Sequence, residues 1–354
     1  MNRSLKGAPS LGLGVIAALM ALEVGLARIV TAGLPPVPSA SRDAFDAPSI
    51  VTRQIEEGIA AASFSTSGAR LTGNQPIHGA PVIVVLGDSY VVAREVRDEQ
   101  TMGAWIEKLA RASDVDVNVR QYGWRGASAP QYLTVAKEVI QRWNPAQVVV
   151  VLSEDDLGAD PLNRNFPRMT IGKGDEVRTV PAPPSTSDDS GSIFLRRSAL
   201  VALLRARWQR VLERAPASIQ RITSAQLETR GPAPESHVVE AVPRATVKSL
   251  WKAFGSTLTI VYAADVRVNF GHEMEGGERR LLAACDRLRV RCVSARAAML
   301  AARQRGIVAR GFSTTTLGVG HLNAAGHEII ARSVWVALQP RMKGTEQLAS
   351  GRPE

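Results

Sequence analysis

The sequence predicts an α/β domain folded as a three-layer sandwich, with a mostly parallel central sheet between two layers of helices. Three observations predict this fold. Runs such as residues 82–86 and 147–152 are almost entirely apolar, as in strands that are buried on both faces. Amphipathic stretches of helical period separate these runs, and the connections are short, which favours parallel strands. With 354 residues, 45% of them hydrophobic, the chain can bury one large core or two modest ones.

The first half of the domain is expected to alternate strands and helices. Residues 82–86 predict a strand that stops at the turn tripeptide Gly87-Asp88-Ser89. Asn144-Pro145 marks the end of a helix, because a residue before proline is disfavoured in helical conformation. The expected order is strand 82–86, helix 101–112, strand 115–121, helix 130–143 and strand 147–152.

Residues 158–243 break this rhythm and are expected to form an insertion into the same domain. The segment combines a Pro/Ser/Asp-rich loop at 181–192 with an Arg-rich helix at 195–214, and we interpret it as a lid or flap that faces the substrate. Regular order then returns with helix 246–254, strand 257–262, helix 276–288, strand 290–294, helix 295–305 and a last helix that reaches residue 338. The globular domain is thus placed at 81–340, with a polar tail at 341–354.

The N-terminus has the pattern of an export signal. Two cations precede an apolar run in residues 1–32, as in a signal peptide or a membrane anchor. Residues 33–80 are rich in Pro, Ser, Ala and Gly and are expected to be a linker with at most one short helix near 49–62. Both forms of export place the domain outside the cytoplasm: on the periplasmic side of a bacterial inner membrane, or secreted after cleavage.

The charge and the cysteine content limit which partners and ligands we expect. Lys+Arg 43 against Asp+Glu 33 gives a net charge of +10, but no dense basic run occurs and aromatic residues are few, so we do not expect nucleic-acid binding. Cys285 and Cys292 are too few for a zinc site, and neither a metal nor a cofactor is expected. We expect two buried thiols, with a disulfide as the alternative that export would permit.

Ser89 and His321 are the candidate catalytic pair. Ser89 follows a predicted core strand, at the edge where open α/β sheets bind ligands. A serine hydroxyl needs a base before it becomes a nucleophile. His321 lies just before the last helix, in a loop bracketed by Gly318, Gly320 and Gly326. Each residue alone is equally well explained as a turn or structural residue; their order and context single them out.

The order of these motifs resembles the SGNH (GDSL-type) hydrolase superfamily, in particular bacterial members with an N-terminal membrane anchor. The resemblance implies that Ser89 of Gly87-Asp88-Ser89 is the nucleophile and His321 its base. It also implies an oxyanion hole made by the backbone N–H groups of Ser89 and Gly126, with Gly123 a poorer match for the glycine. Asp155 stands where the family has an asparagine that donates the third hydrogen bond.

Two positions depart from the family pattern. An ionised Asp155 accepts hydrogen bonds but cannot donate them, so it would repel an oxyanion unless neighbouring carboxylates keep it protonated. Gly318 stands where the family has the aspartate that orients the histidine. A serine–histidine pair then requires a carbonyl or another carboxylate behind the imidazole.

Two functions follow from the resemblance. The first is an exported serine esterase or O-acyltransferase that acts on ester groups, including O-acetyl groups of acylated polysaccharide, through an acyl-enzyme at Ser89. The second is a catalytically impaired protein of SGNH fold that binds an envelope glycan or a partner protein. The departures at Asp155 and Gly318 favour the second.

Overall fold

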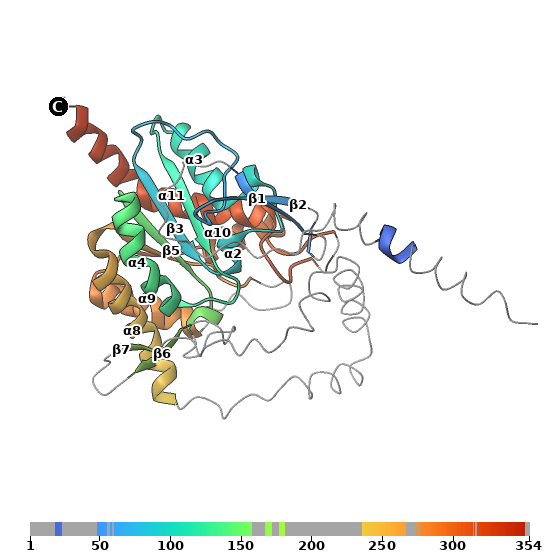
Figure 1. The fold of residues 1–354 in the computed structure, drawn as a ribbon. Helices are drawn as coiled ribbons and strands as arrows, with labels where there is room; N and C mark the ends of the chain where they lie inside the picture. Colours follow the sequence, from blue (N-terminus) through green and yellow to red (C-terminus); the bar gives the residue numbers. More distant parts are fainter. Residues whose placement is uncertain are drawn as a thin grey trace, which may run out of the picture.

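The computed structural model shows a sheet covered by helices on both faces (Figure 1). It describes residues 18–22, 48–54, 57–58, 60–157, 167–171, 177–180, 236–266, 274, 276–313, 315 and 317–350.

Five parallel strands form the central sheet, in the order β4-β3-β5-β8-β9. They are β3 (Val82–Gly87), β4 (Asn118–Gly123), β5 (Gln147–Leu152), β8 (Leu258–Tyr262) and β9 (Cys292–Ser294). Every residue of β5 and β8 is buried, which explains why these segments are almost entirely apolar. The predicted fold class is confirmed.

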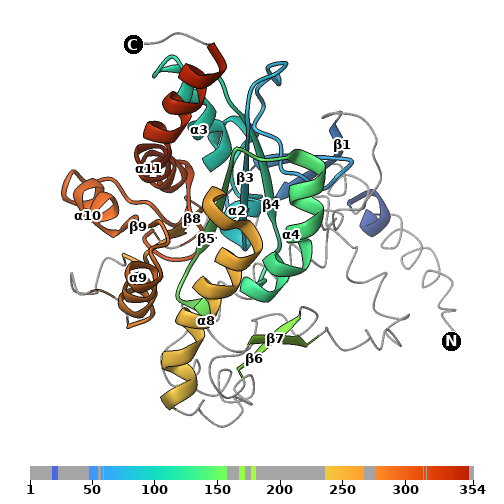
Figure 2. The same ribbon diagram turned by 90° about the vertical axis from the view of Figure 1, so that its left-hand side faces the viewer.

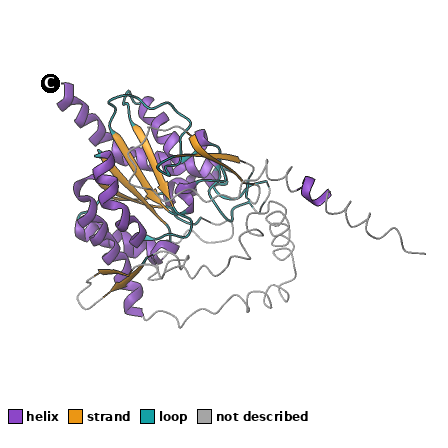
Figure 3. Cartoon of the chain, in the orientation of Figure 1, coloured by secondary structure: helices purple, strands orange, loops and turns teal. Residues whose placement is uncertain are grey.

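Two layers of helices cover the faces of the sheet (Figures 2 and 3). Alternate residues of β3 divide the core between these layers. Ile83 and Val85 pack with side chains of α3 (Met102–Arg111), α10 (Arg296–Gln304) and α11 (Ala324–Ser350). Val84 and Leu86 pack on the other face with α4 (Ala129–Trp143), α8 (Ser236–Phe254) and α9 (Gly276–Leu288). Residues one apart therefore serve opposite layers, as the period of a strand requires.

The segment expected to be a linker contains two strands that pack onto the domain. Strand β1 (Pro48–Gln54) pairs antiparallel with β2 (Ala60–Ser65), so the helix expected near 49–62 is wrong. In β2 the small residues alternate between buried and accessible positions, and Ala62 and Phe64 pack against Val92. Residues 60–65 therefore follow the period of a strand, which their alanine and serine content conceals.

Two further boundaries differ from the prediction because proline lies inside a helix. Helix α8 begins at Ser236 and contains Pro243, and α11 continues through Pro340 to Ser350. Helix α8 therefore begins ten residues before the predicted start at 246, and α11 ends twelve residues after the predicted end at 338. The described part of the insertion also contains the antiparallel pair β6 (Arg168–Ile171) and β7 (Val177–Val180). The loop at 181–192 and the helix at 195–214 lie outside the described residues.

Of the predicted N-terminal anchor, the structure describes only residues 18–22, which are helical. In the described parts of the chain no helix is both long enough and apolar enough to cross a membrane. The anchor prediction otherwise falls outside the described residues.

Cys285 and Cys292 form a disulfide, so the expectation of two thiols is wrong. Helix α9 ends three residues after Cys285, and Arg289 adopts a left-handed conformation with φ of 54° that turns the chain back. The Val290 N–H then bonds the Cys285 carbonyl at 2.9 Å. This tight reversal brings the two Cα atoms to 6.0 Å, within the bridging range.

Arg70 joins the N-terminal strand pair to the rest of the domain. Its buried guanidinium donates to the carbonyls of Leu71 at 3.1 Å, Val96 at 2.9 Å and Ala93 at 3.3 Å, and it pairs with the Asp98 carboxylate. Its own backbone N–H bonds the Gln121 carbonyl of β4 at 2.8 Å. One side chain thus satisfies carbonyls of two loops.

Arg70→Ala is expected to lower the free energy of unfolding by about 3 kcal/mol, because it leaves buried carbonyls and a partly buried carboxylate without their partner. Urea unfolding followed by circular dichroism measures the change. The exposed Arg97, which pairs with Glu99 at the surface, is the matched control, and its alanine variant should change stability by less than about 0.5 kcal/mol. Equal effects of the two variants would contradict this role of Arg70.

Reduction of the disulfide is expected to lower the free energy of unfolding by about 2.5 kcal/mol, as the chain-entropy relation gives for so short a loop. Urea unfolding of the reduced, alkylated protein beside the untreated protein measures it. Before that comparison, alkylation without reductant followed by mass spectrometry should label neither Cys285 nor Cys292. Labelling of both would show that the bridge is absent.

Candidate active site

Ser89 lies just after the carboxyl end of β3, the second strand in the order of the sheet. Strand β3 ends at Gly87, and Asp88 caps the short helix α2 (Ser89–Val92) by accepting a 2.9 Å hydrogen bond from the Tyr90 N–H. Ser89 is half-buried and lies at the edge where parallel strands present ligand sites. Sequence and structure agree on this placement.

The turn after β4 lies against the start of α2. The Trp124 N–H bonds the Gly87 carbonyl at 3.1 Å, and a Cβ at Gly123 would meet the Val92 nitrogen at 2.3 Å. Only glycine permits this close approach. Gly126, further along the same turn, has a φ of +71°. Neither the Ser89 N–H nor the Gly126 N–H donates a hydrogen bond to another residue in the described ranges, so both are available as oxyanion donors.

The loop that carries His321 is held by backbone contacts with residues 308–311. The Gly318 N–H bonds the Arg310 carbonyl at 2.9 Å, and the Gly311 N–H bonds the His321 carbonyl at 3.0 Å. The side-chain amide of Asn323 also donates to the Val308 carbonyl at 2.8 Å. Gly318 and Gly320 have positive φ values of 84° and 87°, which the tight loop requires.

Arg310 connects this loop to the residue beside the candidate nucleophile. Its buried guanidinium donates to the Gly320 carbonyl at 3.2 Å and to the Tyr90 hydroxyl, and it pairs with Asp265 at 3.5 Å. The Tyr90 ring in turn meets the His321 ring edge-on, with 6.1 Å between ring centres. The structure therefore brings the Ser89 and His321 segments together. Within the described residues no hydrogen bond joins the Ser89 hydroxyl to His321, and such bonds are often long before substrate binds.

A carboxylate that the sequence did not reveal stands behind His321. Oε2 of Glu57 lies 2.5 Å from the His321 Nδ1 and accepts the His321 backbone N–H at 3.0 Å. Oε1 of Glu95 lies 3.9 Å from the same Nδ1. Because Nδ1 faces a carboxylate, the ring carries its proton there and leaves Nε2 free to act as a base.

These carboxylates change the proton affinity of the imidazole. Burial lowers the pKa of His321, but the hydrogen bond that its ring donates to Glu57 and the charges of Glu95 and Glu57 outweigh this effect, so the pKa is raised overall. Burial raises the pKa of Glu57, yet the bonds and charge of His321 leave it below the ordinary value. Arg125, exposed on the turn after β4, lowers both pKa values through its charge. The pair is thus stabilised in its ionised form.

Glu57 was missed because it lies 264 residues from His321, in the segment interpreted as a linker. No spacing rule joins two residues at opposite ends of a chain. The one available signal was Gly318, whose lack of a carboxylate indicated that another residue stands behind the imidazole.

Strand β5 is followed by two aspartates that have different surroundings. Asp155 is exposed at the start of the 3-10 turn η2 (Asp155–Leu157). Asp156 is buried and accepts from the Ser153 N–H at 2.7 Å and from the Tyr132 hydroxyl at 3.0 Å. Burial and then the charge of Asp88 raise the pKa of Asp156 well above its usual range, and burial raises the pKa of Asp88 to about 6. Asp156 thus fixes the turn, and Asp155 is the carboxylate open to solvent.

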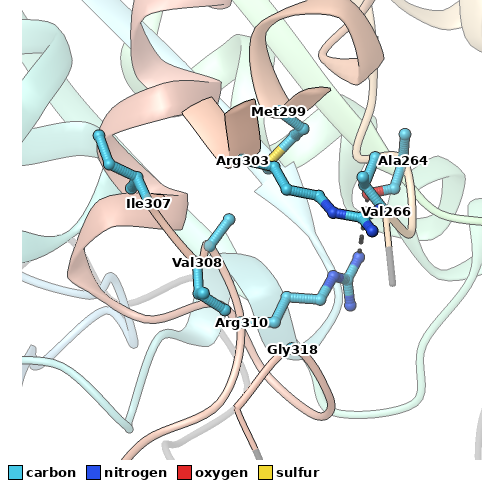
Figure 4. Close-up of a pocket in the computed structure, with 9 residues that line it drawn as sticks. Ala264, Val266, Met299, Arg303, Ile307, Val308, Arg310 and Gly318 are labelled. Carbon is cyan, nitrogen blue, oxygen red and sulfur yellow. Dashed lines mark hydrogen bonds between the residues drawn. The ribbon is translucent and has the colours of Figure 1, made fainter. Parts of the chain in front are cut away.

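A largely apolar pocket lies behind Arg310, between the end of β8 and α10 (Figure 4). Met299, Ile307 and Val308 line it, and Gly318 closes the side toward the His321 loop. In Figure 4 the Arg310 guanidinium reaches across the pocket to the Ala264 carbonyl, a contact of 3.4 Å. Since Arg310 also holds Gly320 and Tyr90, the pocket and the candidate catalytic loop share one wall.

Comparison with known proteins gives structural likeness without sequence relatives. No protein-family model and no curated protein matches the chain. Among solved structures, the lipase/acylhydrolase from Enterococcus faecalis is similar at 11% identity and a TM-score of 0.42, over 74% of this chain and 96% of that one. The family 3 carbohydrate esterase from Clostridium thermocellum is similar at 9% identity and a TM-score of 0.40, over 75% and 98%. A catalytic mutant of the acetylxylan esterase Axe2 from Geobacillus stearothermophilus is similar at 12% identity and 0.39, over 75% and 96%.

Proposed function

We propose that this protein is a serine esterase of the SGNH type, with Ser89 as nucleophile and His321 as general base. The observation that carries the proposal is the hydrogen bonding and the position of the His321 ring. Its Nδ1 is bonded to a carboxylate, and its ring lies against Tyr90, the residue after Ser89. A base oriented in this way beside a serine, at the carboxyl edge of a parallel sheet, is the arrangement that acyl transfer needs.

The reaction proceeds through an acyl-enzyme. His321 Nε2 takes the proton of Ser89 Oγ as that oxygen attacks the ester carbonyl carbon. The N–H groups of Ser89 and Gly126 stabilise the resulting oxyanion. The bond to the alkoxide breaks and His321 returns the proton to it. Water then attacks the acyl carbon while His321 takes its proton. The bond from that carbon to Ser89 Oγ breaks, and His321 returns the proton to Oγ; an acceptor hydroxyl in place of water gives O-acyl transfer.

We propose that the substrate is an ester group, such as an O-acetyl group, on an envelope or exported polysaccharide. The net charge of +10 supports an anionic polymer as the carrier. Two features support export: the basic-then-apolar pattern of residues 1–32, and the disulfide between Cys285 and Cys292, a bond of oxidising compartments. In this proposal the domain faces the periplasm, anchored to the inner membrane or released by cleavage.

A second candidate function is the binding of a glycan or partner protein by a catalytically impaired member of the fold. Asp155 is the observation that favours it. This exposed carboxylate stands where the family has a hydrogen-bond donor, and when ionised it repels the oxyanion. The two functions differ in whether Ser89 turns over an ester.

Ser89→Ala and His321→Ala are each expected to lower the hydrolysis of p-nitrophenyl acetate by at least about 10³-fold, because nucleophile and base act as a unit. Steady-state kinetics on the purified full chain measure kcat and KM. Ser256→Ala and His78→Ala alter exposed residues of the same kinds and should keep the wild-type rate. Wild-type rates in both Ser89→Ala and His321→Ala would refute the esterase proposal.

Asp155→Asn is expected to raise kcat/KM by up to about 10²-fold, because the amide adds a donor where the carboxylate adds charge. The same ester assay measures it, with Glu154→Gln as a neighbouring exposed control. An unchanged rate in Asp155→Asn would show that Asp155 either lies outside the oxyanion hole or already donates a hydrogen bond in its protonated form.

A further inference from the structure

We infer that Glu57 is the positioning residue of His321, and that the β1–β2 pair, which carries Glu57 on its connecting turn, is therefore part of the active site. The inference rests on the proposed function and deepens it. In the family pattern, the carboxylate that orients the histidine comes from the position of Gly318. Here we assign that role to a residue from the N-terminal end of the domain.

The first argument is the double contact made by one oxygen atom. Oε2 of Glu57 meets both the backbone N–H of His321 at 3.0 Å and the ring Nδ1 at 2.5 Å. Contacts to the backbone and to the ring together fix the side-chain torsion of the histidine. Glu95, whose nearest oxygen is 3.9 Å from Nδ1, adds charge but lies beyond hydrogen-bond distance.

The second argument is the close fit of the turn around these contacts. A Cβ at Gly320 would lie 2.9 Å from Oε1 of Glu57, so the loop leaves room for this carboxylate and no more. A Cβ at Gly58 would lie 2.6 Å from the Glu95 carbonyl and 2.8 Å from the Phe312 ring. The turn is therefore seated between the loop after α2 and the loop before His321.

The third argument is that the strand pair is anchored to the domain independently of Glu57. Phe64 of β2 is buried against Val92 of α2. The Ser63 N–H bonds Oδ1 of Asp98 at 3.0 Å, and the same Asp98 pairs with the buried Arg70. Glu57 is thus held in place by contacts that do not use its own side chain, as a preorganised catalytic carboxylate requires.

Gly318 explains why the carboxylate comes from elsewhere. Its φ of +84° is a conformation that disfavours any residue with a Cβ, so an aspartate at this position would strain the loop. Glu57 supplies the carboxylate from the opposite end of the domain. The site is complete only when the strand pair is docked.

Several charged groups surround His321, and each bears on its titration. Glu57 and Glu95 favour the imidazolium, and Arg125 opposes it. Asp88 at the end of β3 and His327 of α11 interact electrostatically with His321. Glu57 differs from all of them in also bonding Nδ1, so its removal affects both the charge and the orientation of the ring.

The test compares Glu57→Gln with Glu95→Gln and with Glu99→Gln, an exposed control nearby. Glu57→Gln should lower kcat by about 10²–10⁴-fold with little change in KM, because a neutral amide no longer selects the productive tautomer. In the wild type, activity should fall as pH drops through the raised pKa of His321, and Glu57→Gln should shift this acidic limb of the pH profile to lower pH. Glu95→Gln should move the limb in the same direction while keeping the plateau kcat. Glu99→Gln should change neither.

Nuclear magnetic resonance titration of the His321 imidazole supplies a readout that does not depend on turnover. The pKa of His321 should fall in Glu57→Gln, and the resonance of the hydrogen-bonded Nδ1 proton should disappear, whereas Glu95→Gln should retain that resonance. Thermal unfolding checks that each variant is folded. A wild-type pH profile and an unchanged imidazole spectrum in Glu57→Gln would overturn the inference, even with Ser89→Ala inactive. Activity in Ser89→Ala would instead refute the proposed function. The titration would then still show whether Glu57 bonds Nδ1 of His321.

Discussion

The hydrogen bond between Glu57 and Nδ1 of His321 is the interaction on which the candidate site depends. It joins the turn of the N-terminal strand pair to the loop before the last helix, and so closes the domain across its whole length. Burial alone would leave the imidazole a poor proton acceptor, because it lowers the pKa. The carboxylate reverses that effect and fixes which ring nitrogen is free.

The parallel sheet places the other parts of the site. Strands β3, β4 and β5 run side by side, so their carboxyl ends meet at one edge of the sheet. Each of these ends carries a different part of the candidate site. These parts are Ser89 after β3, the Gly126 turn after β4 and the acidic turn after β5. Arg310 then ties the His321 loop to this edge through Tyr90 and Gly320. The apolar core fixes the strands, and the polar contacts at their ends position the reacting groups.

The sequence predicted the parts that depend on local pattern. The buried strands, their order along the chain and the placement of Ser89 follow from apolar runs and turn residues, and the structure agrees with them. It missed β2, because alanine and serine carry little signal for a strand, and with β2 it missed the turn that holds Glu57. It began one helix after Pro243 and ended the last helix before Pro340, where tertiary packing overrides the local cost of proline. The disulfide depends on one left-handed residue, Arg289, that no periodicity reveals.

Direct detection of the acyl-enzyme tests the central claim, that Ser89 is the nucleophile of an ester-cleaving site. The full chain is mixed with an activated acetyl ester, quenched in acid, digested, and the peptides are weighed by mass spectrometry. The account predicts one acetyl group on the peptide that contains Ser89, formed before steady state and lost on further incubation. Ester cleavage with no label on Ser89, or with stable label on another residue, would contradict it.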